Sequence, residues 1–290
     1  MDFSFSDEQT LLQDSIVRFI QNDYAFEDRQ KTVRQDPGFS AALWAQFAEL
    51  GWLGVPFSEA DGGFGGSAVD TMIIMEQFGK GLVVEPFLAT VVLAGGALKV
   101  AGNAAQKQKY LASIIDGSAQ AALAFVEPQG RYNLADLTTT AEAKGSGWVI
   151  NGAKAVVLNG PSADFLVVSA RTAGGQRDRD GVSLFVVPAD ADGVSRRDYP
   201  TVDAFRASEI SFDGVTVAED ALVGEAGAGL AALEQVIDEA ILAVGSEAVG
   251  AMEVLYRDTV EYCKTREQFG QPIGQFQVLQ HRMVDMFMEH

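Results

Sequence analysis

The sequence is poor in the residues that build several common kinds of site. It has one cysteine, Cys263, and two histidines, His281 and His290, among 290 residues. A single cysteine forms no internal disulfide, which suits a reducing cytoplasm. Because Cys263 lies in a helical pattern, we expect a buried structural thiol and not a nucleophile. We also expect neither a metal site nor a Ser-His-Asp triad, since both need more histidine or cysteine than this chain has.

Basic residues and long apolar runs are also scarce. The 40 acidic residues outnumber the 21 basic ones and give a formal charge of -19. This charge repels phosphate backbones, so we expect no nucleic-acid partner. The stretch 82–101 comes nearest to a membrane span, but Glu85, Pro86 and Lys99 interrupt it. The N-terminus shows no signal-peptide pattern, and the sequence therefore predicts a cytoplasmic protein without a membrane span.

Apolar residues are plentiful enough for two or three packed units, at 48% of the chain. The first 117 residues are expected to be helical. Ser6 and Gln9 have the spacing of a capping box. An apolar stripe follows at helical spacing, made of Leu11, Leu12, Ile16, Phe19 and Ile20. Further helices are expected over 41–50, 69–78, 87–100 and 104–115, and the glycine-rich segment 51–66 is expected to be irregular.

From about residue 118 the pattern becomes that of strands. Short β-rich runs cover residues 121–126, 138–143, 148–150, 165–169, 182–187 and 210–217. Turn residues separate them, among them Asn151-Gly152 and the polar segment 174–181. Short strands at near-regular spacing are typical of an antiparallel barrel or sandwich.

After Gly227 the helical period returns. Residues 230–265 predict one long helix of a bundle, and a last helix begins near Phe276. No glycine, asparagine or proline ends that helix before His290, so we expect the bundle to be truncated. The predicted fold is therefore α+β. It has an N-terminal helical bundle over 1–117, a central antiparallel β-barrel over 118–224 and an incomplete C-terminal helical bundle over 225–290.

Motifs along the whole chain resemble, in order, those of the acyl-CoA dehydrogenase family. They are LWAQFAELGWLGVPFSEADGGFGG (43–66), Phe125-Val126-Glu127-Pro128, Asn151-Gly152-Ala153-Lys154 and Arg266-x-x-Phe269-Gly270-x-Pro272-Ile273-x-x-Phe276-Gln277. Residues 132–136 and 169–175 look closest to the small subunits of the members that act on pimeloyl-CoA. The resemblance implies FAD as cofactor and α,β-dehydrogenation of an acyl-CoA. It also implies an electron-transfer flavoprotein as electron acceptor.

The family places two polar motifs against the flavin ring, a Val-Thr-Glu-Pro segment and a Trp-x-Ser/Thr strand. The positions that match them here are Phe125, Val126, Val156 and Leu158. Aliphatic side chains thus occupy positions where the family has two hydroxyl groups and one aromatic side chain. Backbone amides could still reach the ring, but the side chains themselves are better interpreted as ordinary β-core.

In contrast, the Arg266 motif has side chains suited to binding the cofactor. The resemblance implies that this segment crosses a subunit interface and holds the pyrophosphate and adenosine end of a neighbour's FAD. Its proposed contacts are Arg266, Gln268, Phe269, Ile273 and Gln277. An arginine offers a bidentate fork to a diphosphate, and Phe and Gln add an apolar face and an amide. The alternative is that Arg266 pairs locally with Glu261; the complete motif favours the cofactor role.

No catalytic carboxylate is expected within this chain. Most family members carry the base near the end of the C-terminal domain, beyond residue 290 here. Others carry it on the long helix, where this chain has Ala240 followed by Ile241. Glu239 lies about 100° around the helix from that position, and Glu234 and Asp238 are read as surface charges.

These features predict the small, non-catalytic subunit of a hetero-oligomer, paired with a catalytic acyl-CoA dehydrogenase. Two alternatives remain open. One is a homotetrameric enzyme whose catalytic Glu lies beyond residue 290. The other is a flavin-free structural partner of a catalytic homologue.

Overall fold

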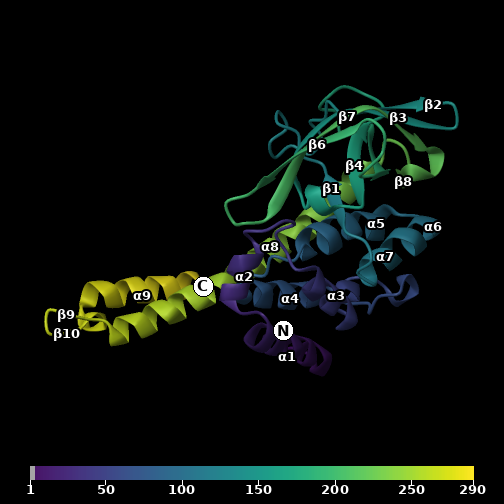
Figure 1. The fold of residues 1–290 in the computed structure, drawn as a ribbon. Coiled ribbons are helices and arrows are strands. Elements are labelled where there is room, and N and C mark those ends of the chain that lie inside the picture. The colour runs from purple at the N-terminus through teal and green to yellow at the C-terminus, as the bar shows by residue number, and fades with distance from the viewer. Residues whose placement is uncertain (1–3) are drawn as a thin grey trace. The chain divides into compact units, whose positions relative to one another are not determined.

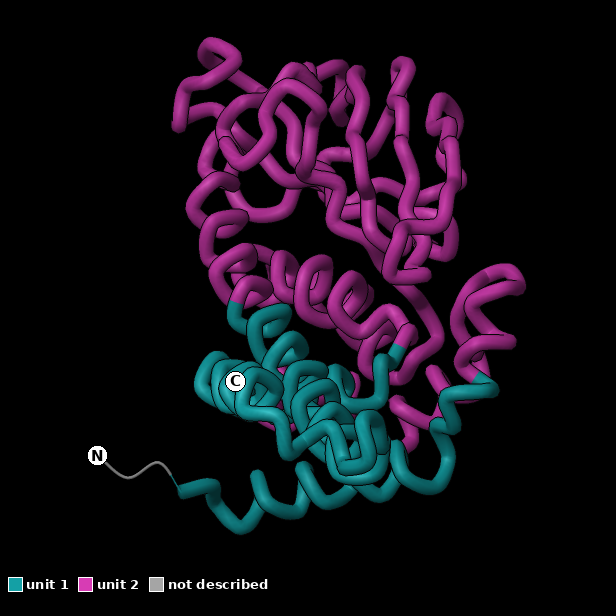
Figure 2. Tube along the Cα trace, turned by 90° about the vertical axis from the view of Figure 1, so that its left-hand side faces the viewer, with its two compact units in different colours: residues 1–28, 69–83, 242–290 teal, residues 29–68, 84–241 magenta. Residues whose placement is uncertain are grey.

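The computed structural model describes residues 4–290. The chain divides into two compact units (Figure 2). Unit 1 comprises residues 1–28, 69–83 and 242–290, and unit 2 comprises residues 29–68 and 84–241. Among the helices of the described residues, none is both long and apolar enough to cross a membrane.

The first helix of unit 1, α1 (Asp7–Asp23), begins at the predicted capping box. The Gln9 amide donates to Ser6 Oγ at 3.2 Å, and the Ser6 amide donates to Gln9 Oε1 at 3.1 Å. Ile16 and Phe19 are buried as predicted. Leu11 is 65% exposed, so the predicted stripe is wrong there, because α1 buries only the narrow face that carries Ile16 and Phe19.

Two glycines let helices α4 (Ala68–Gly81) and α8 (Gly229–Thr265) cross with their backbones in contact. A Cβ atom on Gly79 would lie 1.9 Å from the carbonyl oxygen of Glu247, and one on Gly250 would lie 1.8 Å from that of Glu76. Any larger residue at either position would push the helices apart. Figure 1 shows α9 (Gln277–Glu289) folded back along the C-terminal half of α8, where the Tyr256 and Phe287 rings are 5.8 Å apart.

The helices of unit 2 lie close to the predicted positions. They are α3 (Ala41–Glu49), the π-helical η3 (Leu88–Gly95) that continues as α5 (Gly96–Ala101), and α6 (Ala104–Gln106), the π-helical η4 (Lys107–Leu111) and α7 (Ala112–Ile115). The short α2 (Phe26–Thr32) was not predicted. Residues 51–66 contain only the 3₁₀ turns η1 (Trp52–Gly54) and η2 (Glu59–Asp61), as the glycine content predicted.

The strands of unit 2 form one sheet in the order β6-β7-β3-β2-β4-β5-β8, and β1 pairs in parallel with β4 (Figure 1). Their bounds are β1 Ala121–Ala124, β2 Thr140–Lys144, β3 Gly147–Leu158, β4 Phe165–Arg171, β5 Val182–Pro188, β6 Val194–Pro200, β7 Arg206–Ala218 and β8 Leu222–Val223. The predicted closed barrel is wrong. Within residues 4–290 the two end strands, β6 and β8, do not pair with each other, and β8 has only two residues to offer.

Two local predictions about the strands are also wrong. Asn151-Gly152 was expected to be a turn, but it lies inside β3, at a register shift opposite β7. Gly152 is needed there because a Cβ atom would lie 2.6 Å from Thr139 Cα. Strand β6 was missed because its sequence, VSRRDYP, is charged and mostly exposed, as befits an edge strand.

Candidate functional site

The two segments predicted to face a flavin ring lie side by side in unit 2. Phe125 and Val126 follow β1, whereas Val156 and Leu158 belong to the end of β3. The amide of Ala155 donates to the carbonyl oxygen of Val126 at 2.8 Å. The structure therefore brings the two halves of this predicted group together through a backbone hydrogen bond.

Val156 has an unusual backbone conformation. Its φ is +50°, and the residue is 48% exposed. It lies in a bulge, since Lys154 pairs with Ile210 of β7 but Val157 pairs with Ser208. The left-handed region is a genuine outlier for a β-branched residue, and outliers of this kind concentrate at functional sites.

A buried ion pair lies directly beside these segments. Lys154 Nζ is 2.7 Å from Glu127 Oε1, and both side chains are almost completely inaccessible. Lys154 also donates to Ser169 Oγ at 3.1 Å. Glu127 accepts further hydrogen bonds from the Thr138 amide and hydroxyl, the Thr139 amide and the Gln129 side chain. The sequence motifs contained both residues, but their pairing was not predicted from the sequence. The pairing could have been inferred from their opposite charges, because each lies one or two residues from a position predicted to face the flavin.

The surroundings shift the pKa of both partners. Burial alone would raise the pKa of Glu127, but the Lys154 ammonium and the hydrogen bonds from Thr138 lower it to about 2. Burial lowers the pKa of Lys154, and the Glu127 carboxylate offsets part of that effect. The lowered Glu127 pKa keeps its carboxylate ionised at neutral pH.

The Arg266 segment of unit 1 forms a tight hairpin. Strand β9 (Glu267–Gln268) pairs with β10 (Gln271–Pro272), and Phe269 and Gly270 form the two-residue turn between them. Both turn residues have positive φ, +55° and +77°, as in a type I′ turn. Phe269 is 91% exposed, with its ring 6.1 Å from that of Phe276.

The side chain of Arg266 is exposed at the base of this hairpin. The alternative pairing with Glu261 is wrong, because Glu261 pairs with Lys264 at 2.5 Å. In the part of the chain that the structure describes, the Arg266 guanidinium makes no ion pair. The hairpin instead uses the backbone of Arg266, whose carbonyl oxygen accepts from the Ile273 amide at 2.8 Å.

The two glutamines of this segment differ. Gln268 donates its side-chain amide to the neighbouring Glu267 carbonyl at 2.7 Å, whereas Gln277 is exposed at the start of α9. Arg266 and Gln277 thus have polar groups that could hold a diphosphate and an adenosine. This fits one end of FAD, while the residues of unit 2 that were predicted to face the ring offer only backbone groups.

The position on α8 where some family members carry a base has no carboxylate. Ala240 occupies it and is buried, and Ile241 is 64% exposed. Glu239 points elsewhere, as predicted, and pairs with Lys99 at 2.7 Å. Glu234 pairs with Arg179. Among residues 4–290 there is also no group of three His, Cys, Asp or Glu side chains that could hold a metal.

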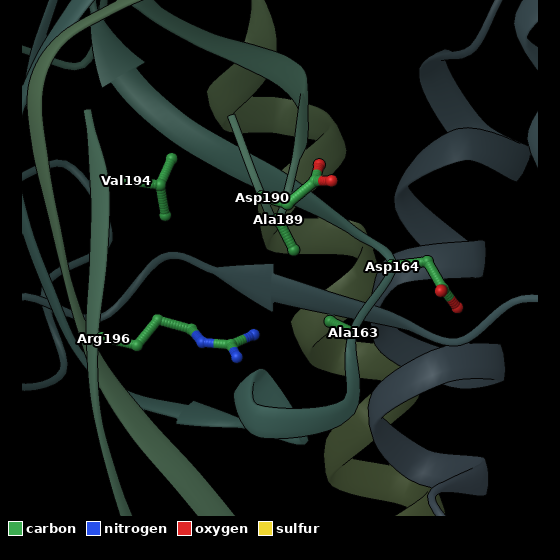
Figure 3. A pocket seen from close by; sticks show the side chains of 6 residues that line it. All are labelled: Ala163, Asp164, Ala189, Asp190, Val194 and Arg196. Carbon is green, nitrogen blue, oxygen red and sulfur yellow. The ribbon is translucent and has the colours of Figure 1, made fainter. Parts of the chain in front are cut away.

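An open pocket of ≈ 360 Å³ lies elsewhere in unit 2 (Figure 3). It is lined by Ala163, Asp164, Ala189, Asp190, Val194 and Arg196. Two of its charged groups already have protein partners, since Arg196 donates to the Gly160 carbonyl at 3.1 Å and Asp164 accepts from the Gln120 amide at 2.7 Å. None of the predicted cofactor residues lines it.

Comparison with known proteins gives a consistent family assignment. Three family models match in order: acyl-CoA dehydrogenase N-terminal domain over residues 6–118, middle domain over 122–215 and C-terminal domain over 227–290. The mitochondrial isovaleryl-CoA dehydrogenase of Solanum tuberosum is 32% identical over 98% of this chain and 70% of that protein. Benzylmalonyl-CoA dehydrogenase of Aromatoleum aromaticum is 30% identical over 99% of this chain and 76% of that protein.

Solved structures show the same similarity. Butyryl-CoA dehydrogenase from Megasphaera elsdenii superposes with a TM-score of 0.91 at 26% identity, covering 100% of this chain and 77% of that one. The FAD complex of PigA gives 0.91 at 29% identity, with 99% and 76% covered. Matches of this extent and identity show family as well as fold. The chain therefore belongs to the acyl-CoA dehydrogenase family of FAD-binding oxidoreductases that act on CH–CH groups.

Proposed function

We propose that this chain is the small subunit of a two-subunit acyl-CoA dehydrogenase and that it completes the FAD site of a catalytic partner. The observation that carries the proposal is the hairpin at Arg266. It presents an exposed guanidinium and an exposed Phe269. The α8 position that could hold a base is the buried Ala240. The chain thus has groups suited to binding a cofactor and no carboxylate at this α8 position.

The hairpin suits the pyrophosphate and adenosine end of FAD. A guanidinium offers paired N–H donors to phosphate oxygens, and the exposed ring of Phe269 offers a flat apolar face. Ile273 extends this surface, and Gln268 and Gln277 supply amide groups beside it. Arg266, Gln268, Phe269 and Gln277 are exposed, so their side chains can reach a cofactor held by another subunit.

The ring-facing residues of unit 2 have a more limited role. Phe125, Val126, Val156 and Leu158 have no hydrogen-bonding side chain, so only their backbone N–H and C=O groups can meet the polar edge of a flavin. In the complex, FAD supplies the hydride acceptor for α,β-dehydrogenation of an acyl-CoA. The carboxylate that removes the α-proton then belongs to the partner, and an electron-transfer flavoprotein takes the electrons.

A dicarboxylyl substrate such as pimeloyl-CoA is supported only by the sequence similarity of residues 132–136 and 169–175 to small subunits of the members that act on pimeloyl-CoA. In the structure these two segments meet at Arg171, which donates to the carbonyl of Ala135 at 2.7 Å. Arg171 also donates to the carbonyls of four other residues, namely Ala173, Gln176, Asp178 and Asp180. Its guanidinium is thereby used to hold the loop 173–180, so it is not the group that would bind a distal carboxylate.

Substitution of Arg266 tests the proposed role. We expect Arg266→Ala to weaken FAD binding in the complex of this chain with its catalytic partner. The binding free energy should change by roughly 1.5–3 kcal/mol, the usual contribution of a charge-assisted hydrogen bond. The melting temperature should hardly change, because the side chain is exposed and unpaired. FAD retention is measured from the flavin absorption after gel filtration.

Arg282→Ala is the matched control, since Arg282 is another exposed arginine of unit 1. It should leave FAD retention unchanged. Equal retention by wild type and Arg266→Ala would contradict the proposal. A complex that never binds FAD would instead favour the flavin-free structural partner.

A further inference from the structure

A cofactor site built from main-chain groups depends on the position of the backbone more than a site built from side chains does. Val126, Val156 and Leu158 can contact a cofactor's polar edge only through main-chain groups, and those cannot move without moving the strand. A shift of one segment relative to the other would change every contact at once. Something must therefore hold the two segments at a set spacing if they bind a ring.

The Glu127–Lys154 pair connects these segments through covalent neighbours. Glu127 follows Val126 directly, and Lys154 precedes Val156 by two residues. Their side chains meet at 2.7 Å, and the residues next to them in sequence, Ala155 and Val126, are joined by a backbone hydrogen bond. Through Ser169 and the Thr138 and Thr139 amides the pair also reaches β4 and the two residues that precede β2. The segments that follow β1 and precede β2 are thus tied to β3 and β4 at one point.

Stability alone is a weak reason for such a pair. Removing two charges from water is costly, and well-packed apolar residues often replace a buried ion pair without loss of stability. What the pair supplies is fixed geometry, since Glu127 accepts hydrogen bonds from four residues and Lys154 donates to two. The bulge beside it also keeps Val156 in the left-handed region, which a β-branched residue would leave if the surroundings allowed it.

We infer that Glu127 and Lys154 are positioning residues of the flavin site: together they fix the segment after β1 against the bulge of β3. This inference rests on the proposed function, because it assumes that Val126 and Val156 face a flavin. It assigns no chemical step to either residue. It predicts that the spacing of the two segments is lost when the pair is removed, even where the sheet stays folded.

The test uses the full chain with the double substitution Glu127→Gln and Lys154→Met, which removes both charges with little change of volume. Val187→Ala is the matched control, because Val187 is fully buried in the core of the same sheet and pairs with Leu166 of β4, outside both segments. Hydrogen exchange of the Ala155 amide reports the backbone contact with Val126. Fluorescence titration with FAD, carried out on the complex of each variant with the catalytic partner, reports binding.

We expect the double variant to speed exchange at Ala155 relative to the other amides of β3 and to weaken FAD binding about tenfold, a change typical of a displaced contact. In Val187→Ala, exchange should rise across the sheet without singling out Ala155, and FAD binding should stay within about twofold of wild type. Unchanged Ala155 exchange in the double variant would overturn the inference. So would selective exchange at Ala155 with unchanged FAD affinity, because the pair would then be structural only.

The two proposals can fail separately. If Arg266→Ala lowers FAD retention in the complex but the double variant does not, the clamp at the hairpin stands and the positioning role falls. If neither the chain nor its complex binds FAD, the proposed function fails, and the inference with it.

Discussion

Phe269 combines two unfavourable properties in one residue. A large apolar side chain is 91% exposed, and its backbone adopts φ +55° in a turn that favours asparagine or glycine. Neither property helps the isolated chain to fold. An exposed phenylalanine in this conformation is best explained by a contact with a ligand or another subunit. The Phe269 ring is therefore central to the proposed clamp on the adenosine end of FAD.

Replacing Phe269 should separate stability from function. Phe269→Asn places Asn-Gly in the type I′ turn and should raise the free energy of unfolding by about 1 kcal/mol, because the left-handed conformation costs other residues roughly 1–2 kcal/mol. The same variant should weaken FAD binding in the complex. Chemical denaturation and flavin retention measure the two effects.

Phe269→Ala serves as the comparison, since it removes the ring without supplying a better turn residue. It should weaken FAD binding as much as Phe269→Asn does, with no comparable gain in stability. If Phe269→Asn retains full FAD affinity, the ring has no part in the clamp. The sequence alone could identify Phe269 as a motif residue, but it could not show the positive φ, because phenylalanine has no intrinsic preference for that region.

At the scale of elements, the ion pair between Glu127 and Lys154 makes the stability of the sheet depend on pH. In the folded chain the pKa of Glu127 is lowered to about 2 from its ordinary value of 4.5. The stabilisation from ionised Glu127 is therefore fully present above the unfolded pKa and is lost as the pH falls toward 2. The sheet should weaken in acid for this reason.

A comparison of wild type with the Glu127→Gln/Lys154→Met double variant isolates this contribution. Between pH 5 and pH 3 the free energy of unfolding of the wild type should fall further than that of the double variant, by roughly 2 kcal/mol, and the difference should reach about 3 kcal/mol only below pH 2, where Glu127 is protonated in the folded chain as well. Urea denaturation at several pH values provides the measurement. Parallel pH profiles for the two proteins would show that Glu127 does not titrate as its surroundings imply.

Elements with strong local patterns were predictable, and those set by tertiary pairing were not. The long helix was predicted over 230–265 and is observed as Gly229–Thr265, because its apolar period and length leave few alternatives. The charged strand β6 and the bulge at Asn151-Gly152 depend on pairing with β7, which no local pattern encodes. Closure of the sheet likewise depends on whether its two end strands pair, so the barrel could not be told from an open sheet.

At the scale of the whole molecule, the sequence motifs were sufficient to assign the family, whereas the proposed cofactor contacts stay predictions. They could not show which charges are already engaged. Arg171, Glu239 and Glu261 each carry a charge that a sequence leaves free to act, and in the structure each has a protein partner. Arg266 differs from these three residues, because within residues 4–290 its guanidinium makes neither an ion pair nor a hydrogen bond.

The visible absorption spectrum of this chain, purified alone and then with its catalytic partner, tests the central claim most directly. The account predicts a colourless chain and a yellow complex, because the hairpin completes a site that another subunit carries. A chain that is yellow on its own, with stoichiometric FAD that is bleached by an acyl-CoA, would contradict it. That result would show an acyl-CoA dehydrogenase that needs no separate catalytic subunit.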